Sequence, residues 1–278
     1  MHIQGNTFIV TGGASGLGEA VVRELLKRGA KVAIFDLNED AARSQELAQS
    51  LGENAFFPGK VDVVSEEIVQ AALQKTVAHF GKIAGVINCG GVATAAKIAR
   101  RGKSSHTLTM DLFDFTVRVN LVGTFNVCRQ VAQIMANQDP FNDDGMTRMS
   151  TKIETNMIMA GERGVIINTA SVAYQDGQQG QVAYAASKGG VASMTLPMAR
   201  DLAPAGIRVM TIAPGIFETN MTSVMNDTAK AKIIRDAVFP ERMGQPQEFA
   251  ALAGHIIENR MLNGEIIRID CASRLGKL

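Results

Sequence analysis

Short runs of β-branched and other apolar residues alternate with longer segments of helical periodicity along the whole chain. The short runs lack the polar and apolar alternation of a half-exposed strand, which is typical of strands buried on both faces of a parallel sheet. Seven such strands are expected, at residues 7–10, 31–35, 55–61, 85–88, 165–169, 208–212 and 265–269.

Helical periodicity fills most of the intervals between these strands, at residues 17–28, 39–51, 66–80, 121–137 and 184–202. Strands that alternate with helices predict an α/β fold with one doubly wound, Rossmann-type parallel sheet of about seven strands and helices on both faces. Right-handed crossovers place the strand carboxyl ends along one edge, where ligands bind. No linker rich in Pro, Gly or Ser divides the chain, so residues 1–278 are expected to form a single domain.

One stretch, residues 139–163, departs from this rhythm. It is polar and rich in methionine, and Met146, Met149, Ile153 and Met157 fall at helical spacing, which allows a short amphipathic helix. Because it joins a helix to a strand, we expect it on the edge opposite the strand carboxyl ends. A surface insertion and an oligomer or partner contact are both open interpretations.

Composition excludes several classes of protein. The 278 residues carry a net charge of +1, which gives no electrostatic case for binding nucleic acid or a membrane surface. No apolar run approaches the length of about 18 residues that suggests a membrane helix. The three cysteines and four histidines are isolated, so we expect no metal site. Because the N-terminus shows no signal peptide, we expect a cytoplasmic location, or the mitochondrial matrix if a transit peptide was removed.

A glycine-rich turn follows the first strand and opens the first helix. Residues 11–18 read TGGASGLG, in which the glycines have the spacing G-x3-G-x-G. Glycines permit a tight turn and let a pyrophosphate approach the backbone, and the helix N-terminus offers free N–H groups to the phosphates. The turn predicts a dinucleotide site with contacts from Gly12, Ser15, Gly16, Leu17 and Gly18.

Asp36 ends the second strand, eighteen residues after Gly18. A carboxylate at this place can accept hydrogen bonds from both hydroxyls of an adenosine ribose, and it repels a 2′-phosphate. No arginine or lysine lies in the glycine turn or directly after Asp36 to offset that repulsion. The sequence therefore predicts NAD rather than NADP, although an aspartate that only caps the following helix is the alternative.

Two further strand ends are candidates on position alone. Asp62 and Val63 end the third strand, where they would border the adenine. Asn88 and Gly90 belong to Asn-Cys-Gly-Gly at the end of the fourth, where small residues leave room for the cofactor ribose.

Tyr184 and Lys188 stand four residues apart, and Ser171 lies thirteen residues before the tyrosine. On a helix, residues i and i+4 share a face. A positive charge at roughly 4 Å and an effective dielectric near 20 contributes about 4 kcal/mol, or about three pKa units, whereas burial disfavours the phenolate. We expect the lysine to outweigh burial and to lower the pKa of Tyr184. A tyrosine and lysine on a solvated helix face are the alternative.

These features together resemble the short-chain dehydrogenase/reductase family over nearly the whole chain. Five segments are similar to its subgroup of type-2 3-hydroxyacyl-CoA dehydrogenases, also known as type-10 17β-hydroxysteroid dehydrogenases: residues 163–171, 183–190, 194–204, 206–215 and 262–268. The resemblance implies an NAD-dependent oxidoreductase of fatty acid metabolism that interconverts a 3-hydroxyacyl-CoA and a 3-ketoacyl-CoA by hydride transfer. A hydroxysteroid or other secondary alcohol is the alternative substrate, and a non-catalytic NAD-binding scaffold or partner protein is the alternative class.

Carried over to this sequence, the resemblance implies four catalytic residues. Tyr184 is the general base in oxidation and the acid in reduction, and Lys188 lowers its pKa and holds the nicotinamide ribose. Ser171 hydrogen-bonds the substrate oxygen. Asn120 positions a water in a proton relay behind Lys188.

The resemblance also implies residues that border the ligands: Pro214, Gly215, Phe217 and Thr219 at the nicotinamide, and Gln178 and Gln181 at the substrate entrance. It implies that residues 217–239 cover the substrate and that the protein forms a homo-oligomer, either a tetramer or a dimer. Coenzyme A phosphates could be attracted by the basic residues after the fourth strand, although solvated loop cations are common: Lys97, Arg100, Arg101 and Lys103. Where the family usually has alanine, Gly90 removes a methyl group and loosens the turn.

Overall fold

Seven short apolar strands form one parallel sheet in the order β3-β2-β1-β4-β5-β6-β7. The computed structural model describes residues 1–37, 41–101, 107–141, 161–223 and 234–274. The strands are β1 (Thr7–Thr11), β2 (Lys31–Phe35), β3 (Ala55–Phe56), β4 (Gly85–Asn88), β5 (Gly164–Thr169), β6 (Ile207–Pro214) and β7 (Ile266–Ile269). The prediction of a doubly wound α/β fold is confirmed.

One strand is shorter than expected. β3 ends at Phe56 instead of residue 61. Pro58 has no N–H to donate to a sheet, and Gly59 has a φ of 112° that breaks the extended backbone.

Eleven helical elements connect the strands in the described part of the chain. They are α1 (Gly16–Lys27), α2 (Ala41–Ser50), α3 (Glu66–Phe80), α4 (Met110–Val117), the π-helical η1 (Arg118–Gly123), α5 (Thr124–Ala136), α6 (Ala173–Asp176), α7 (Val182–Leu202), the 3-10 turn η3 (Ala203–Ala205), α8 (Asn220–Ser223) and α10 (Pro246–Glu258).

The hydrophobic pattern missed α4 and α10, although both have recognisable start signals. The hydroxyl of Thr109 accepts a hydrogen bond from Leu112 N and so caps α4. α10 begins with Pro246, and the Glu248 carboxylate accepts a hydrogen bond from Gln245 N. Capping residues therefore mark these helices better than periodicity does.

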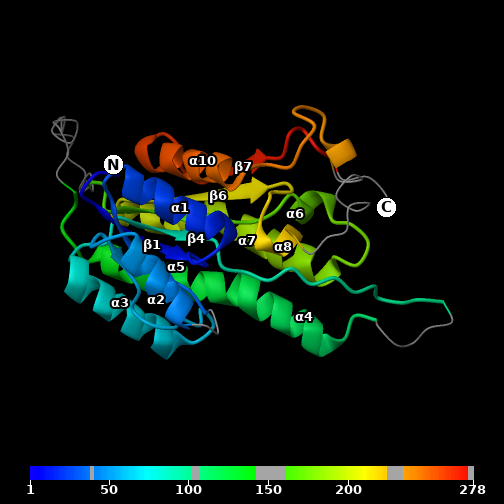
Figure 1. Ribbon diagram of the computed structural model, residues 1–278, viewed down its shortest axis with the longest axis horizontal. Coiled ribbons are helices and arrows are strands. Elements are labelled where there is room, and N and C mark those ends of the chain that lie inside the picture. The colour runs from blue at the N-terminus through cyan, green and yellow to red at the C-terminus, as the bar shows by residue number, and fades with distance from the viewer. Residues whose placement is uncertain (38–40, 102–106, 142–160, 224–233, 275–278) are drawn as a thin grey trace.

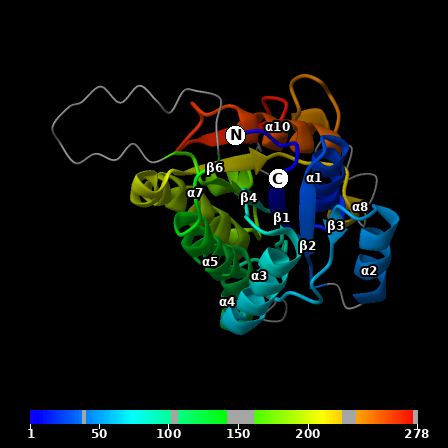
Figure 2. The same ribbon diagram turned by 90° about the vertical axis from the view of Figure 1, so that its left-hand side faces the viewer.

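The helices cover both faces of the sheet. Figure 2 shows α1 and α10 on one side of the strands and α3, α5 and α7 on the other. Successive side chains of a strand point to opposite faces, so Phe8 packs with Leu25 of α1 and Phe249 of α10. Its neighbour Ile9 belongs to the second core, with residues of α3 and α5 such as Val131.

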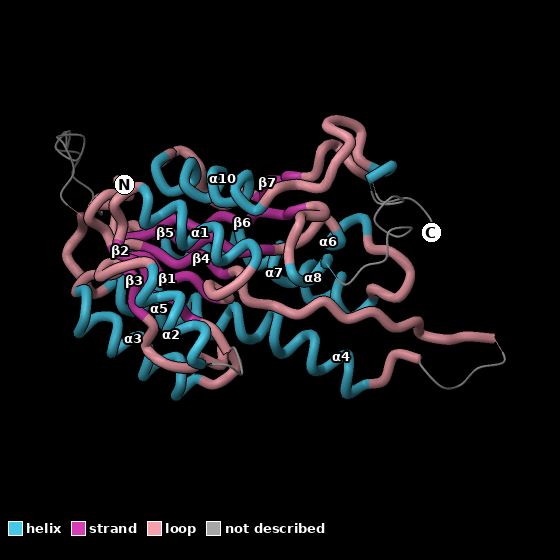
Figure 3. The backbone as a smooth tube through the Cα atoms, viewed as in Figure 1, coloured by secondary structure: helices cyan, strands magenta, loops and turns pink. Residues whose placement is uncertain are grey.

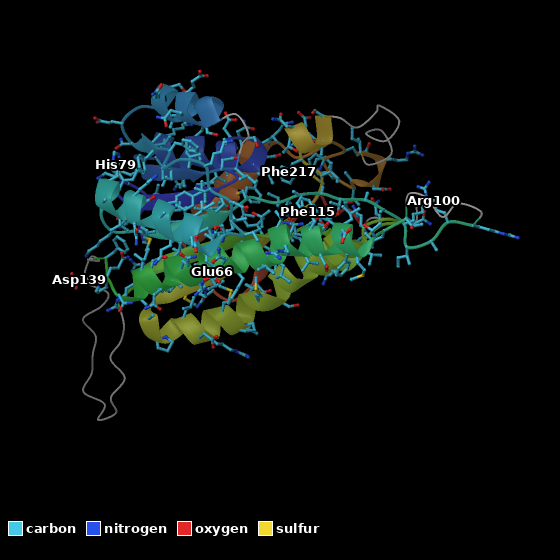
Figure 4. The ribbon with its side chains drawn as sticks, turned by 90° about the horizontal axis from the view of Figure 1, so that it is seen from below. Glu66, His79, Arg100, Phe115, Asp139 and Phe217 are labelled. Carbon is cyan, nitrogen blue, oxygen red and sulfur yellow. The ribbon has the colours of Figure 1, made fainter. Side chains whose placement is uncertain are left out.

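All strand carboxyl ends point to the side of the molecule where α6 and α8 lie (Figures 1 and 3). Asp139 lies at the opposite end of the molecule from Arg100 (Figure 4). The described ends of the 139–163 stretch are therefore away from the carboxyl edge, as expected. The amphipathic helix considered at Met146 to Met157 lies outside the described residues. None of the described helices combines the length and apolar character needed to span a bilayer.

A buried arginine on β6 fastens the end of α10 to the sheet. The Arg208 side chain is 9% exposed, and its Nη1 donates to the carbonyl oxygens of Ile256 (2.9 Å) and Leu262 (2.9 Å). Its Nη2 donates to Ile257 O (2.7 Å), and its Nε donates to the Glu162 carboxylate (2.9 Å). The guanidinium thus satisfies carbonyls that the helix terminus leaves without partners.

Replacement of this arginine by methionine should therefore destabilise the fold. Arg208→Met leaves several buried carbonyls unpaired, and we expect the free energy of unfolding to fall by about 3 kcal/mol. Urea denaturation followed by circular dichroism measures the change. Arg200→Met, on an exposed position of α7, is the control and should stay within about 0.5 kcal/mol of wild type. Equal stability of the two variants would contradict the capping role.

Candidate active site

Two adjoining cavities open at the carboxyl edge of the sheet. The first, of about 320 Å³, is lined by the glycine turn, Asp36 and residues 61–63, and we call it the glycine-turn cavity. The second, of about 270 Å³, contains Ser171 and Tyr184, and we call it the Ser–Tyr cavity. Five residues line both: Leu17, Cys89, Gly91, Val92 and Thr219. The cavities therefore form two ends of one site.

The glycine turn lies where backbones approach closely. Gly12 has a φ of 62°, and a Cβ on it would lie 2.9 Å from Gly90 Cα. A Cβ on Gly18 would collide with the carbonyl oxygen of Gly12. Only glycine fits these two positions, so the main chain itself forms the cavity wall. The five residues predicted from this turn all line the cavity: Gly12, Ser15, Gly16, Leu17 and Gly18.

The other predicted cofactor residues mostly meet at the same cavity. Asp36 lines it, and its Oδ2 accepts a hydrogen bond from Ala14 N (2.9 Å). Asp62, Val63 and Gly90 also line it. Asn88 is different: it lines neither cavity, is buried, and its Nδ2 donates to Asn168 Oδ1 (2.9 Å) behind the wall.

The residues after β6 lie at the second cavity. Pro214, Gly215 and Phe217 line the Ser–Tyr cavity, and Thr219 lies on the wall common to both. The hydroxyl of Thr222 donates to Phe217 O (2.8 Å) and accepts from Thr219 N (2.9 Å). Thr222 therefore holds this segment against the cavity, a role that no sequence motif indicated. The rest of the 217–239 segment is described only up to residue 223 and from 234 onward.

Ser171, Tyr184 and Lys188 come together in the Ser–Tyr cavity. The Tyr184 hydroxyl shares a hydrogen bond with Ser171. Lys188 is 6% exposed, its Nζ donates to Thr169 O (2.8 Å), and it lies 5.8 Å from the centre of the Tyr184 ring. The arrangement follows from α7, which presents residues four apart on one face.

Burial dominates the ionisation of both groups. It raises the pKa of Tyr184 above its ordinary value, and the hydrogen bond from Ser171 acts in the opposite direction. Burial also lowers the pKa of Lys188 to about 8, although the neighbouring Cys89 acts to raise it. The expectation that Lys188 lowers the pKa of Tyr184 by more than burial raises it is therefore wrong. The ammonium is directed at Thr169 O and stays 5.8 Å from the centre of the Tyr184 ring.

Asn120 lies in the π-helical turn and is fully buried. Its Oδ1 accepts from Val92 N (2.8 Å), and its Nδ2 donates to Val92 O (2.9 Å) and Ser187 Oγ (3.0 Å). A Cβ on Gly91 would lie 2.9 Å from Asn120 Oδ1 and 3.5 Å from Lys188 Nζ, so the amide and the lysine are neighbours. The side chain thus fastens the common cavity wall at Val92 to α7.

The two glutamines predicted at the substrate entrance also line the Ser–Tyr cavity. Gln181 Oε1 accepts a hydrogen bond from Gln178 N (2.9 Å). Gln178 Nε2 is buried and has no hydrogen-bond partner in the described part of the chain. Such an unpaired donor costs about 1–3 kcal/mol, which a ligand oxygen could recover.

The position of Cys89 at the site was not expected from the sequence. Its half-buried thiol lies on the common wall, and burial raises its pKa to about 12 despite a hydrogen bond from Thr169 and the charge of Lys188. The thiol therefore stays protonated at neutral pH. Its place directly after a strand carboxyl end was the available signal.

No cluster of described His, Cys, Asp and Glu residues could hold a metal ion.

The connection from β4 to α4 leaves the site as an extended arm, described for residues 89–101 and 107–109 (Figure 1). Its base is fixed by Thr94, whose hydroxyl lies 2.7 Å from that of Thr116. Further along, Ala96 N donates to Gly180 O (2.9 Å), next to the glutamines. The arm therefore borders the entrance to the Ser–Tyr cavity.

Comparison with known proteins agrees with this geometry. A family model described as short chain dehydrogenase matches residues 6–140 and 141–230. The chain is 45% identical over 273 residues to the 3-hydroxyacyl-CoA dehydrogenase type-2 of Bos taurus, covering 98% of this chain and 97% of the relative. It is 33% identical over 282 residues to ipsdienol dehydrogenase of Ips pini, covering 99% of each.

A solved structure matches as well. The crystal structure of 3-hydroxyacyl-CoA dehydrogenase type-2 from Mycobacterium avium is 39% identical, covers 99% of this chain and 98% of its own, and superimposes with a TM-score of 0.86. The family model alone spans most of the chain, and the relatives match it along nearly the whole length. This chain therefore belongs to the short-chain dehydrogenase family, and it is an oxidoreductase that works with a nicotinamide cofactor.

Proposed function

We propose that this protein is an NAD-dependent dehydrogenase that interconverts 3-hydroxyacyl-CoA and 3-ketoacyl-CoA. The observation that carries the proposal is the meeting of Ser171, Tyr184 and Lys188 in one cavity that continues into the glycine-turn cavity. A scaffold without catalysis would not need these three side chains together. In this proposal, residues 1–278 act as one short-chain dehydrogenase domain. We also predict a cytoplasmic or mitochondrial matrix location.

The glycine-turn cavity fits a dinucleotide. Gly12 and Gly18 bring bare backbone to the wall, and the N-terminus of α1 favours phosphate there. The Asp36 carboxylate at the end of β2 suits a ribose with free hydroxyls and disfavours a 2′-phosphate. Asp62 and Val63 then border the adenine, and residues 214–219 border the nicotinamide.

The protein residues move the proton and hold the substrate oxygen. When bound, the cofactor supplies the redox step by taking a hydride from the alcohol carbon or returning it to the ketone. Tyr184 accepts the alcohol proton in oxidation and donates it in reduction, and Ser171 hydrogen-bonds the reacting oxygen. The high pKa of Tyr184 keeps its proton available for reduction. In oxidation, the positive charge of Lys188 at 5.8 Å from the ring centre favours the phenolate of Tyr184, but it acts against burial without outweighing it.

Several features support a thioester substrate. Relatives named 3-hydroxyacyl-CoA dehydrogenase type-2 share 43–45% of their residues with this chain. The Ser–Tyr cavity has apolar walls at Val172, Ile216 and Phe217, which suit an acyl chain. Lys97, Arg100 and Arg101 lie on the arm after it passes the cavity entrance at Ala96, and Arg100 lies well outside the body of the molecule (Figure 4). These cations favour the phosphates of coenzyme A, and Lys103 lies outside the described residues.

A different secondary alcohol is the second candidate. The ipsdienol dehydrogenase relative acts, by its name, on an alcohol without a thioester. The same apolar walls accommodate a hydroxysteroid or a terpene alcohol. Substrate profiling with acetoacetyl-CoA, a steroid alcohol and a simple secondary alcohol separates these candidates.

We also propose that the protein is a homo-oligomer, either a tetramer or a dimer. The continuous helix α4–η1–α5 exposes three large apolar side chains: Phe115 (50% exposed), Val122 (46%) and Phe125 (45%). Large exposed apolar side chains on one helix favour association. Light scattering of the purified chain measures the state.

Removal of the Tyr184 hydroxyl should abolish most turnover. Tyr184→Phe takes away the proton carrier, so we expect kcat for acetoacetyl-CoA reduction to fall by roughly 10²–10⁴-fold. NADH affinity, followed by fluorescence titration, should change little. Tyr174→Phe changes the other tyrosine and serves as the control. Activity of Tyr184→Phe close to that of wild type would remove this residue from the mechanism.

Cofactor preference should shift towards NADP when the charge at the end of β2 is changed. Wild type should prefer NAD, and Asp36→Ala combined with Leu37→Arg should shift the ratio of kcat/KM values towards NADP by roughly 10–100-fold, or about 1.4–2.8 kcal/mol. Leu37 is exposed, so the arginine can reach solvent and a phosphate. Steady-state kinetics with both cofactors measure the ratio. A wild-type preference for NADP would refute the role of Asp36.

Loss of the unpaired amide should affect substrates unequally. Gln178→Met removes a donor suited to the thioester oxygen, so kcat/KM for acetoacetyl-CoA should fall by roughly 10-fold, or about 1.4 kcal/mol. A simple secondary alcohol, which has no second oxygen, should lose little. Gln175→Met, in the same segment but exposed, is the control. Equal losses for both substrates would show that Gln178 does not select for the thioester.

A further inference from the structure

A buried amide on α5 holds the turn that forms the far wall of the glycine-turn cavity. Asp62 and Val63 line this cavity. Asn126 lines neither cavity and is 5% exposed, yet its Nδ2 donates to Val63 O (2.8 Å). The side chain therefore reaches the cavity wall from behind.

A second amide orients the first. Gln130 Nε2 donates to Asn126 Oδ1 (2.8 Å) and to Glu66 O (3.1 Å). The carbonyl oxygens of Val63 and Glu66 can only accept hydrogen bonds, so the orientation of both amides follows from their partners. A chain of hydrogen bonds thus runs from the start of α3 through Gln130 and Asn126 to Val63.

Close packing supports the same wall. A Cβ on Gly123 would lie 2.6 Å from Val63 Cγ2, so the helix approaches the turn as closely as a glycine allows. The ion pair between Arg129 and Glu66 (2.8 Å) also joins α5 to the start of α3. The turn has its own bonds too, because Asp62 Oδ1 accepts from Val64 N (3.0 Å). It is therefore a shaped element pressed on α5.

We infer that Asn126 is a positioning residue for the adenosine half of the cofactor. The inference rests on the proposed function, in which a dinucleotide occupies the glycine-turn cavity. Asn126 fixes Val63 through its carbonyl and has no bond to Ser171, Tyr184 or Lys188 among the described contacts. Its loss should therefore weaken binding of the adenosine end and leave alignment at the nicotinamide end intact.

The test separates the two halves of the cofactor. Asn126→Leu is close in volume and removes both hydrogen bonds of the amide. We expect the Kd for ADP-ribose and the KM for NAD to rise roughly tenfold, or about 1.4 kcal/mol. The Kd for reduced nicotinamide mononucleotide and the kcat at saturating NAD should stay within about twofold of wild type. A mere loss of folded protein would lower kcat and leave Kd values unchanged.

A second variant reaches the same turn by another route. Gly123→Ala keeps the hydrogen bond from Asn126 but pushes a methyl group against Val63. It should therefore also weaken the binding of ADP-ribose and leave the binding of the mononucleotide unchanged. Gln138→Met is the matched control, because Gln138 Nε2 clamps Ile83 O (2.7 Å) from the other end of α5, near the opposite edge of the sheet. It should lower thermal stability without changing the KM for NAD.

Each outcome decides one point. If wild type binds ADP-ribose and both Asn126→Leu and Gly123→Ala keep its Kd, the positioning role is wrong while the cofactor site stands. Equal weakening of ADP-ribose and the mononucleotide also overturns it, because Asn126 would then support the whole site. If wild type binds neither ADP-ribose nor NADH, the proposed function fails and this inference fails with it.

Discussion

Burial of one ammonium group organises the catalytic end of this protein. Lys188 has almost no contact with solvent, and a charge in such a place is stable only with close polar partners. Thr169 O, at the carboxyl end of β5, provides one at 2.8 Å. The bond ties α7 to the centre of the sheet and so fixes the depth of Tyr184. The lowered pKa of Lys188 reports the remaining cost of burial.

The helix α4–η1–α5 has a similar organising role for the walls of the site. Asn120 binds both main-chain groups of Val92 on the wall common to the two cavities, and Asn126 binds Val63 O on the far wall. Side-chain amides suit this task because each has a donor and an acceptor in fixed geometry. The π-helical turn that contains Asn120 is a feature often found at functional sites. One helix thus sets the spacing between two walls.

The sequence predicted the sheet and most of the residues that meet at its edge, because runs such as FIV and GVIIN and glycines at tight approaches are dictated by local physics. It did not predict the balance of charge at Tyr184, since burial and side-chain direction are properties of the packed fold. The role of Asn126 was not predicted because Val63, which it holds, is 63 residues away in sequence, whereas Cys89 had a local signal in its place after a strand carboxyl end. β3 is shorter than the apolar run predicts because Pro58 and Gly59 interrupt the extended backbone.

The anchored base of the arm has an evolutionary consequence. Thr94 is fixed to Thr116, and Val92 is fixed to Asn120, before the chain leaves the body of the protein. Changes in length or composition beyond Thr94 therefore alter what enters the site without disturbing the proton-transfer groups. Loops of this kind can be exchanged between homologues, so new substrate ranges can arise on an unchanged reaction centre.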